Sequence, residues 1–260
     1  MTDLQRIAIS SEQLSGATLH LDPEQRHYLC RVLRLRRGDR FIALDEQDSG
    51  WVAALNSETQ AQVLGPHHQP TELPCQVTLQ MAMPKTGMED IIRQTTELGV
   101  YDIQPVTSDR VILKPSAHKL ERWQRVAREA AEQSERQHWP RVYPAIPWRD
   151  ALDPVVQRHQ APAAFRPVRY ICTARRSETH LLQHLTDLGA IPAAVVLAVG
   201  PEGGWTEGEV EAAMAADYQP ASLGTRILRA VTAPVAAMTL IAAGCDVATP
   251  LEPIHIPMDL

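Results

Sequence analysis

The stretch VGPEGGWTEGEVEAA, residues 199–213, follows the apolar run AAVVLA at 193–198 and carries the first indication of both fold and function. Thr206 and Glu209 have the spacing of a capping box, which predicts a helix that begins directly after GPEGGW. A buried strand, a glycine-rich turn and a helix N-terminus together leave free backbone N–H groups that can bind a ligand. Taken alone, the turn is equally compatible with a tight connection that binds nothing.

The residues around Glu202 limit the kind of ligand. Neither GxxxxGK[ST] nor GxGxxG is present, and a carboxylate in the turn would repel a phosphate. We therefore expect a neutral or cationic ligand that is held by backbone groups. A second loop, LGTRILR at 223–229, precedes an apolar helix for which Thr232 is a possible N-cap and Gly244 a possible end. Two such loops fit a site at the carboxyl ends of parallel strands.

The chain divides into two parts with different patterns. From residue 75, strands are expected at 75–82, 101–106, 169–174 and 193–199, and helices at 87–99 and 118–137. This alternation predicts an α/β domain with a largely parallel sheet over residues 75–260. Residues 1–70 hold short strand-like runs and one helix, with Asp22 and Gln25 as its capping box, which is typical of a small β-barrel or sandwich. The proline-rich segment 65–74 is the expected linker.

The composition excludes several classes of protein. The chain has 260 residues, 44% of them hydrophobic and 22% charged, and no apolar run approaches the roughly 18 residues that a membrane helix needs. The N-terminus shows no signal peptide, and the four cysteines form no CxxC pair, so we expect a cytoplasmic protein without a metal site. The net charge of -6 argues against indiscriminate binding of nucleic acid but permits a local basic site.

Six segments occur in the order and spacing of a known family. They are HYLCRVLRLRRGD (27–39), KTGMEDIIRQTTELGV (85–100), SDRVIL (108–113), REAAEQSERQHWPRV (128–142), VGPEGGWTEGE (199–209) and LGTRILR (223–229). With them the sequence resembles the bacterial 16S rRNA (uracil-N3)-methyltransferases of the SPOUT class. The resemblance implies an α/β fold, in which a SPOUT-type parallel-sheet domain with a deep C-terminal trefoil knot follows a PUA-like, RNA-binding β-barrel. It also implies a homodimer that acts on 16S rRNA of the small ribosomal subunit.

The resemblance further implies that S-adenosylmethionine is the cofactor. This molecule carries a sulfonium and no phosphate, so the charge of Glu202 is compatible with it. Glycines in the turn would let the backbone approach the cofactor closely, and leucine and isoleucine side chains would supply apolar walls. The residues that we expect to bind it are Leu197, Val199, Gly200, Pro201, Glu202, Gly203, Gly204, Leu223, Gly224, Ile227 and Leu228.

Catalysis and RNA binding are assigned on the same basis. Uracil N3–H must lose its proton before it can accept a methyl group, and arginine suits the negative charge that then spreads onto O2 and O4. The expected catalytic residues are Arg229 and Arg136, then Arg226, with Glu202 as a possible proton acceptor. The expected RNA-binding residues are His27, Arg31, Arg34, Arg37, Lys85, Arg110, Gln133 and Arg136. The arginines on the first domain are also compatible with an ordinary solvated face, and Arg136 with an ion pair along its helix.

One departure from the family leaves alternatives open. The family usually has LRTETA where this chain has LRAVTA, so Ala230 and Val231 replace a threonine and a glutamate. Val231 thereby removes a carboxylate near the expected cofactor pocket. The alternatives to an active uracil-N3 enzyme are a non-catalytic RNA-binding relative and a SPOUT methyltransferase that acts on ribose 2′-OH or on another RNA.

Overall fold

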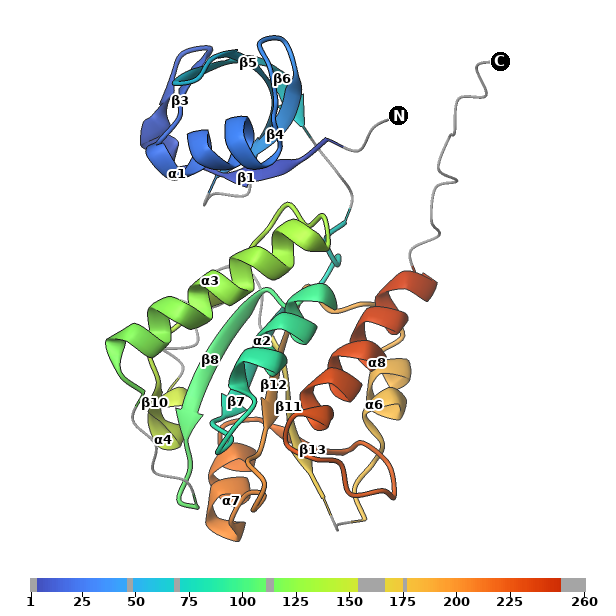
Figure 1. The fold of residues 1–260 in the computed structure, drawn as a ribbon. Coiled ribbons are helices and arrows are strands. Elements are labelled where there is room, and N and C mark those ends of the chain that lie inside the picture. The colour runs from blue at the N-terminus through green and yellow to red at the C-terminus, as the bar shows by residue number, and fades with distance from the viewer. Residues whose placement is uncertain are drawn as a thin grey trace. The chain divides into compact units, whose positions relative to one another are not determined.

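The computed structural model describes residues 4–45, 49–67, 71–110, 115–153, 167–174 and 177–248. The chain splits into two compact units (Figure 1). One unit comprises residues 1–72 together with 128–139, and the other comprises residues 73–127 and 140–260. Within the described ranges, no helix combines the length and the apolar character that crossing a membrane requires.

The first unit is built around a six-stranded sheet in the order β1-β4-β5-β6-β3-β2. The β1–β4 pair is parallel, and the other pairs are antiparallel. The strands curve around one core (Figure 1), in which Leu19, Leu29 and Phe41 are fully buried. The elements are β1 (Arg6–Ala8), η1 (Ser11–Gln13), β2 (Leu14–Ser15), β3 (Thr18–His20), α1 (Pro23–Arg26), η2 (His27–Val32), β4 (Arg40–Leu44), β5 (Gly50–Ser57) and β6 (Gln60–His67). The predicted capping box of Asp22 and Gln25 is confirmed at the start of α1.

The second unit alternates strands and helices. Its elements are β7 (Gln76–Ala82), α2 (Met88–Glu97), β8 (Asp102–Thr107), α3 (Ala117–Gln133), β9 (Arg141–Val142), β10 (Ile146–Pro147), α4 (Trp148–Ala151), β11 (Val168–Thr173), α6 (Leu181–Asp187), β12 (Ala194–Val199), α7 (Glu207–Ala215), β13 (Gln219–Ser222) and α8 (Thr232–Ala248). The end of α3, from Arg128 on, belongs to the first unit. The described strands form a seven-stranded sheet in the order β10-β8-β7-β12-β11-β13, with β9 also paired to β8. Every pair is parallel, which confirms the predicted α/β class.

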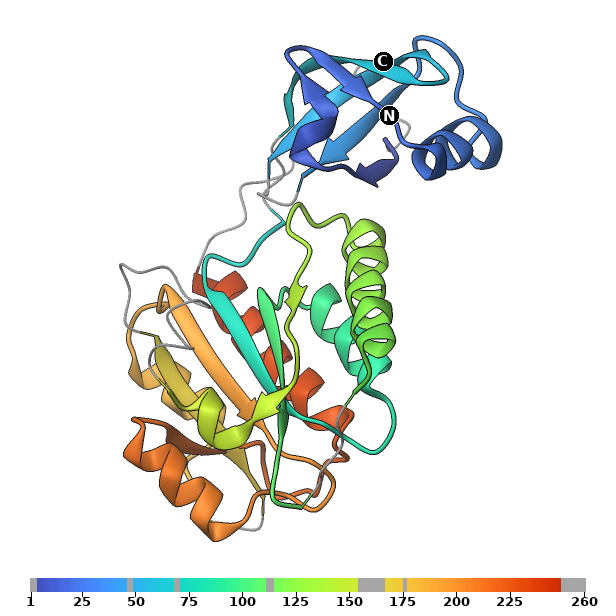
Figure 2. The same ribbon diagram turned by 90° about the vertical axis from the view of Figure 1, so that its left-hand side faces the viewer.

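Helices cover both faces of this sheet (Figure 2). Val195, Leu197 and Val199 of β12 face a core that includes side chains from α2, α3, α6 and α8. Val196 and Ala198 face the opposite core, which includes side chains from α4 and α7. Because successive strand residues point to opposite faces, this strand is buried on both sides, as its continuous apolar run predicts. The loops that leave the carboxyl ends of these strands therefore lie at one edge of a rigid sheet.

The predicted helix boundaries are correct at some ends and wrong at others. Thr206 caps α7 with Glu209 as expected, and Gly99 follows α2 with a φ of 90°. Gly244, however, does not end α8, which continues to Ala248. A helical glycine lowers stability but does not by itself break a helix whose apolar face packs on a core. α3 ends at Gln133 rather than 137, and Glu135 has a left-handed φ of 60°.

A buried hydrogen bond joins β7 to the segment before β13. The hydroxyl of Tyr218 donates to Gln80 Oε1 at 2.7 Å, and Gln80 Nε2 donates to the carbonyl of Ala151 at 3.1 Å. Burial raises the pKa of Tyr218, which keeps this hydroxyl protonated. Gln80 is fully buried, so its carbonyl oxygen cannot turn to water if the hydroxyl is removed.

We expect Tyr218→Phe to lower the free energy of unfolding by about 1–2 kcal/mol, because it leaves that buried acceptor without its donor. Urea denaturation followed by circular dichroism measures the change. Tyr170→Phe is the matched control, since the Tyr170 hydroxyl makes no hydrogen bond to the described residues. Equal losses in the two variants would contradict the assigned role of the Tyr218 hydroxyl.

Candidate functional site

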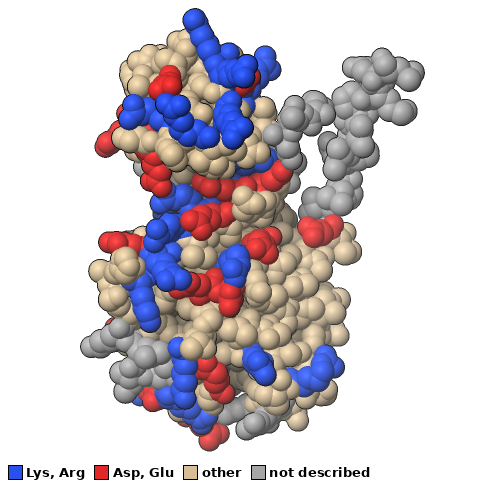
Figure 3. Space-filling model, viewed as in Figure 1, with Lys and Arg blue, Asp and Glu red and all other residues tan. Residues whose placement is uncertain are grey.

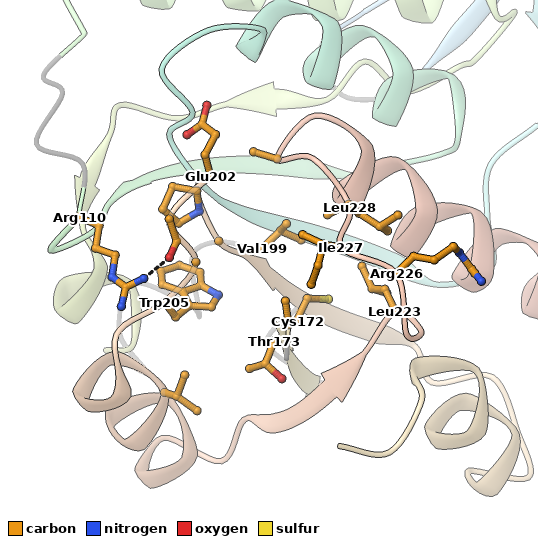
Figure 4. A pocket seen from close by; sticks show the side chains of 18 of the residues that line it. Arg110, Cys172, Thr173, Val199, Glu202, Trp205, Leu223, Arg226, Ile227 and Leu228 are labelled. Carbon is orange, nitrogen blue, oxygen red and sulfur yellow. Dashed lines mark hydrogen bonds between the residues drawn. The ribbon is translucent and has the colours of Figure 1, made fainter. Parts of the chain in front are cut away.

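A pocket of about 340 Å³ lies at the carboxyl ends of β11, β12 and β13 (Figure 4). Its walls come mainly from the loop that follows β12 and the loop that follows β13. All the predicted cofactor-binding residues line the pocket except Leu197. This residue precedes Val199 on β12 and is fully buried in the core. Those that line it are Val199, Gly200, Pro201, Glu202, Gly203, Gly204, Leu223, Gly224, Ile227 and Leu228.

Glycine is required at two positions of these loops. Gly204 has a φ of 69°, and its N–H donates to the carbonyl of Pro201 at 2.8 Å to close the turn. Gly224 has a φ of 105°, in the second loop. Side chains other than glycine rarely adopt these backbone angles. The two turns therefore depend on the residue type that the sequence supplies there.

A buried carboxylate fixes the first loop to its neighbour. Glu209 is 6% exposed, and its Oε1 accepts the N–H of Asp109 at 2.9 Å. Its Oε2 accepts the N–H of Thr206 at 2.7 Å and the hydroxyl of the same residue at 3.0 Å. The guanidinium of Arg110 donates to the carbonyl of Gly203, as the dashed line in Figure 4 shows. The segment after β8 thus contacts the middle of the glycine loop and the start of α7.

The chemistry of the pocket is largely neutral. Burial raises the pKa of Cys172 to about 12, so this thiol is protonated at neutral pH and serves as an uncharged wall rather than a nucleophile. Thr173 Oγ1 and Trp205 Nε1 are buried polar atoms without a hydrogen-bond partner among the described residues. No cluster of His, Cys, Asp and Glu in the described ranges could hold a metal ion. The arrangement suits an uncharged or cationic organic ligand.

Charged side chains stand at the rim of this pocket. Arg110, Glu202 and Arg226 are exposed and line it. Arg229 is exposed but does not line it, and its carbonyl accepts the N–H groups of Thr232 and Ala233 at the start of α8. Of the predicted catalytic arginines, Arg226 alone belongs to the pocket lining.

Arg136 lies elsewhere, in the first unit. Its side chain is 3% exposed, and Nη2 and Nε donate to Glu72 Oε2 at 2.5 and 3.1 Å. Glu72 Oε1 also accepts the backbone N–H groups of Gln137 and His138, at 3.1 and 3.0 Å. Arg136 does not line the pocket, and its ion pair does not run along a helix, because α3 ends before Arg136. The partner is 64 positions away in the sequence, and no local pattern indicated it.

Four of the predicted RNA-binding residues on the first unit are exposed: His27, Arg31, Arg34 and Arg37. Figure 3 shows Lys and Arg side chains gathered over this unit. Arg31 lies 3.9 Å from Glu58, but both side chains are more than two-thirds exposed, so the pair leaves the guanidinium accessible. Gln133, at the end of α3 in the first unit, is exposed as well. On the second unit, Lys85 and Arg110 are exposed.

Sequence reasoning missed the contacts of several residues that shape the site. Glu209 was expected only to cap a helix, although it also binds the loop after β8. Trp205 stacks on Trp148 of α4, with ring centroids 4.5 Å apart. Val231, the departure from the family pattern, packs against the core and faces Gly87, where an added Cβ would lie 2.6 Å from Val231 Cγ1. The sequence signals were the glycine-rich loop, the capping box for Glu209 and the departure from the family pattern at Val231, and none of them indicated these contacts.

Comparison with known proteins identifies similar chains. Residues 71–242 match the RNA methyltransferase domain, and residues 21–63 match the RNA methyltransferase PUA domain. The chain is 45% identical over 239 residues to ribosomal RNA small subunit methyltransferase E of Synechocystis, covering 91% of this chain and 76% of that one. The Bacillus subtilis protein of the same name is 29% identical, with 90% and 94% covered. The Neisseria gonorrhoeae protein of that name, solved with bound S-adenosylmethionine, has a TM-score of 0.78 at 32% identity, with 93% of this chain and 98% of that one covered.

The burial of Arg136 leads to a test of its role. We expect Arg136→Ala to lower the free energy of unfolding by on the order of 2 kcal/mol, because the Glu72 carboxylate loses its charged donor. Affinity for the predicted cofactor should stay the same. Thermal denaturation and calorimetric titration provide the two measurements, with Arg125→Ala, which changes an exposed residue of α3, as the control. If Arg136→Ala unfolds at the same temperature as the wild type, the structural role is contradicted and Arg136 stays a candidate catalytic residue.

Proposed function

Since this chain belongs to the RNA methyltransferase family, we propose that it transfers the methyl group of S-adenosylmethionine to N3 of a uridine in 16S rRNA of the small ribosomal subunit. The observation that carries the proposal is the glycine-lined pocket at the carboxyl edge of the parallel sheet, in which the charged side chains stand at the rim. The N. gonorrhoeae relative binds this cofactor, and the Synechocystis relative is named for the small-subunit RNA.

The residues of the pocket fit the cofactor. Leu223, Ile227 and Leu228 supply apolar walls, and the glycine loops supply backbone donors and acceptors. The unpartnered Thr173 Oγ1 and Trp205 Nε1 give the lining two polar atoms whose hydrogen bonds a ligand with nitrogen and oxygen acceptors can complete after a small shift of the loop. The lining includes one carboxylate, Glu202, and it lacks the lysine that a nucleotide phosphate would need. When bound, S-adenosylmethionine supplies an electrophilic methyl group.

The protein has two tasks in this reaction. It must hold the uridine so that N3 faces the methyl group, and it must stabilise the negative charge on O2 and O4 after N3 loses its proton. Arg226 is the best-placed arginine for that charge, because it lines the pocket and is exposed at its rim. Arg229 is the second candidate, three residues along the same loop. One donor to such an oxyanion contributes roughly 3 kcal/mol.

RNA binding is assigned to both units. The target base must be unpaired to present N3, so the flanking strand needs to be held by its phosphates. We propose that Arg31, Arg34 and Arg37 hold phosphates on the first unit, and that Lys85 and Arg110 do so next to the pocket. We also propose that Gln133 contacts the RNA. The C-terminal trefoil knot, the homodimer and the cytoplasmic location that the resemblance implies are part of the same proposal.

Nucleoside analysis tests the reaction. The purified protein is incubated with labelled S-adenosylmethionine and small ribosomal subunits from a strain that lacks the modification. We expect the label in 3-methyluridine after digestion of the 16S rRNA. Label in a 2′-O-methyl nucleoside would instead support the ribose-methylating alternative, and cofactor binding without any label would support the non-catalytic one.

Gly203 gives a test of the pocket itself. A Cβ at this position would lie 3.1 Å from Arg110 Cδ, so a branched side chain must displace Arg110 or enter the cofactor space. We expect Gly203→Val to weaken binding of S-adenosylmethionine by about tenfold or more, equivalent to about 1.4 kcal/mol. Gly208→Val is the matched control, because nothing lies within 4 Å of its added Cβ. Calorimetry that gives the same dissociation constant for both folded variants would place the cofactor elsewhere.

A further inference from the structure

The loop between β7 and α2, residues 84–87, touches both loops of the cofactor pocket. The backbone N–H of Lys85 donates to Glu202 Oε1 at 3.0 Å, which links it to the loop after β12. Gly87 lies against Val231 Cγ1, at the end of the loop after β13. Gly87 has a φ of 86°, so the loop turns there in a conformation that a larger residue would not adopt. The position of this loop is therefore set by the two loops of the pocket.

The carboxylate of Glu202 is directed toward this loop rather than into the pocket. In Figure 4 its side chain turns away from Val199, Leu223 and Cys172, which face the interior. A carboxylate that accepts a main-chain N–H makes a stronger hydrogen bond than a neutral acceptor does. This contact joins residues 117 positions apart and gives Glu202 a role that needs no proton transfer.

The same loop forms one wall of a second cavity, of about 410 Å³. Lys85 and Thr86 line it from the loop, and Lys119 and Trp123 line it from α3. Its two acidic residues are already paired, Glu89 with Arg122 at 2.7 Å and Asp90 with Arg93. Lys85 and Lys119, by contrast, make no ion pair within the described part of the chain. The uncompensated charge beside the cofactor pocket is therefore positive, which suits a polyanion such as RNA.

We propose that Glu202 is a positioning residue for the RNA: it holds the backbone of Lys85 so that this second cavity receives the nucleotide chain next to the target uridine. The inference rests on the proposed function and assigns the cavity to the phosphates of the same substrate. Glu202 then acts through Lys85 and the 84–87 loop, and its basicity is not used. A displacement of about 1 Å in such an element can cost up to a hundredfold in rate.

Two substitutions separate positioning from proton transfer. Glu202→Gln keeps an oxygen that can accept the Lys85 N–H but removes the charge and the basicity, whereas Glu202→Ala removes the acceptor. We expect Glu202→Gln to retain the methylation rate of the wild type within about threefold, with the same pH dependence of kcat. We expect Glu202→Ala to lower kcat/KM for the RNA by about tenfold or more. Glu211→Ala, which removes an exposed carboxylate from α7, is the control and should not change it.

Binding measurements without turnover complete the test. Affinity for S-adenosylmethionine should stay within about twofold in all variants, and filter binding should show weaker RNA binding for Glu202→Ala alone. A Glu202→Gln protein as inactive as Glu202→Ala would overturn the proposal in favour of proton transfer, and so would an altered pH profile. Full activity and RNA affinity in Glu202→Ala would exclude any role. A wild-type protein that makes no 3-methyluridine contradicts the proposed function, while the RNA affinities still decide the role of Glu202.

Discussion

The carboxylate of Glu209 is the contact on which the site depends most. It is almost fully buried, yet it accepts two backbone N–H groups and one hydroxyl, so its charge is balanced by donors rather than by water. One of these donors belongs to Asp109, after β8, and the others belong to Thr206, at the start of α7. The glycine loop between β12 and α7 is therefore anchored at the helix that follows it. A loop anchored in this way can present backbone groups to a ligand without a large loss of entropy on binding.

The neutrality of the pocket follows from the same construction. Charge is confined to the rim, where Glu202 and Arg110 contact neighbouring loops instead of the interior. Inside the pocket, the walls consist of apolar side chains and backbone groups, and the thiol of Cys172 stays protonated. A cationic cofactor with a reactive methyl group needs such an environment, because water and stray nucleophiles would compete for that group. The glutamate in a glycine-rich turn, which is unexpected for a phosphate site, is consistent with this use.

Much of the fold could be predicted because its signals are local. The apolar run before Val199, the Thr206–Glu209 box and the glycine after α2 each specify structure within a few residues. Arg136 could not be placed in this way, since its partner Glu72 is distant in the sequence and α3 ends before it. Leu197 was expected in the pocket because periodicity cannot show where along a buried strand the ligand begins. The contacts of Glu202 and Val231 with the 84–87 loop likewise arise only when strands β7 and β12 pair.

A crystal structure of the protein with S-adenosylmethionine tests the central claim most directly. The account predicts electron density for the cofactor between residues 200–204 and 223–228. At least one of Thr173 Oγ1 and Trp205 Nε1 should lie within about 3 Å of a ligand nitrogen or oxygen atom. Cofactor density at any other part of the chain would contradict the account. An empty pocket between these two loops at a saturating cofactor concentration would contradict it as well.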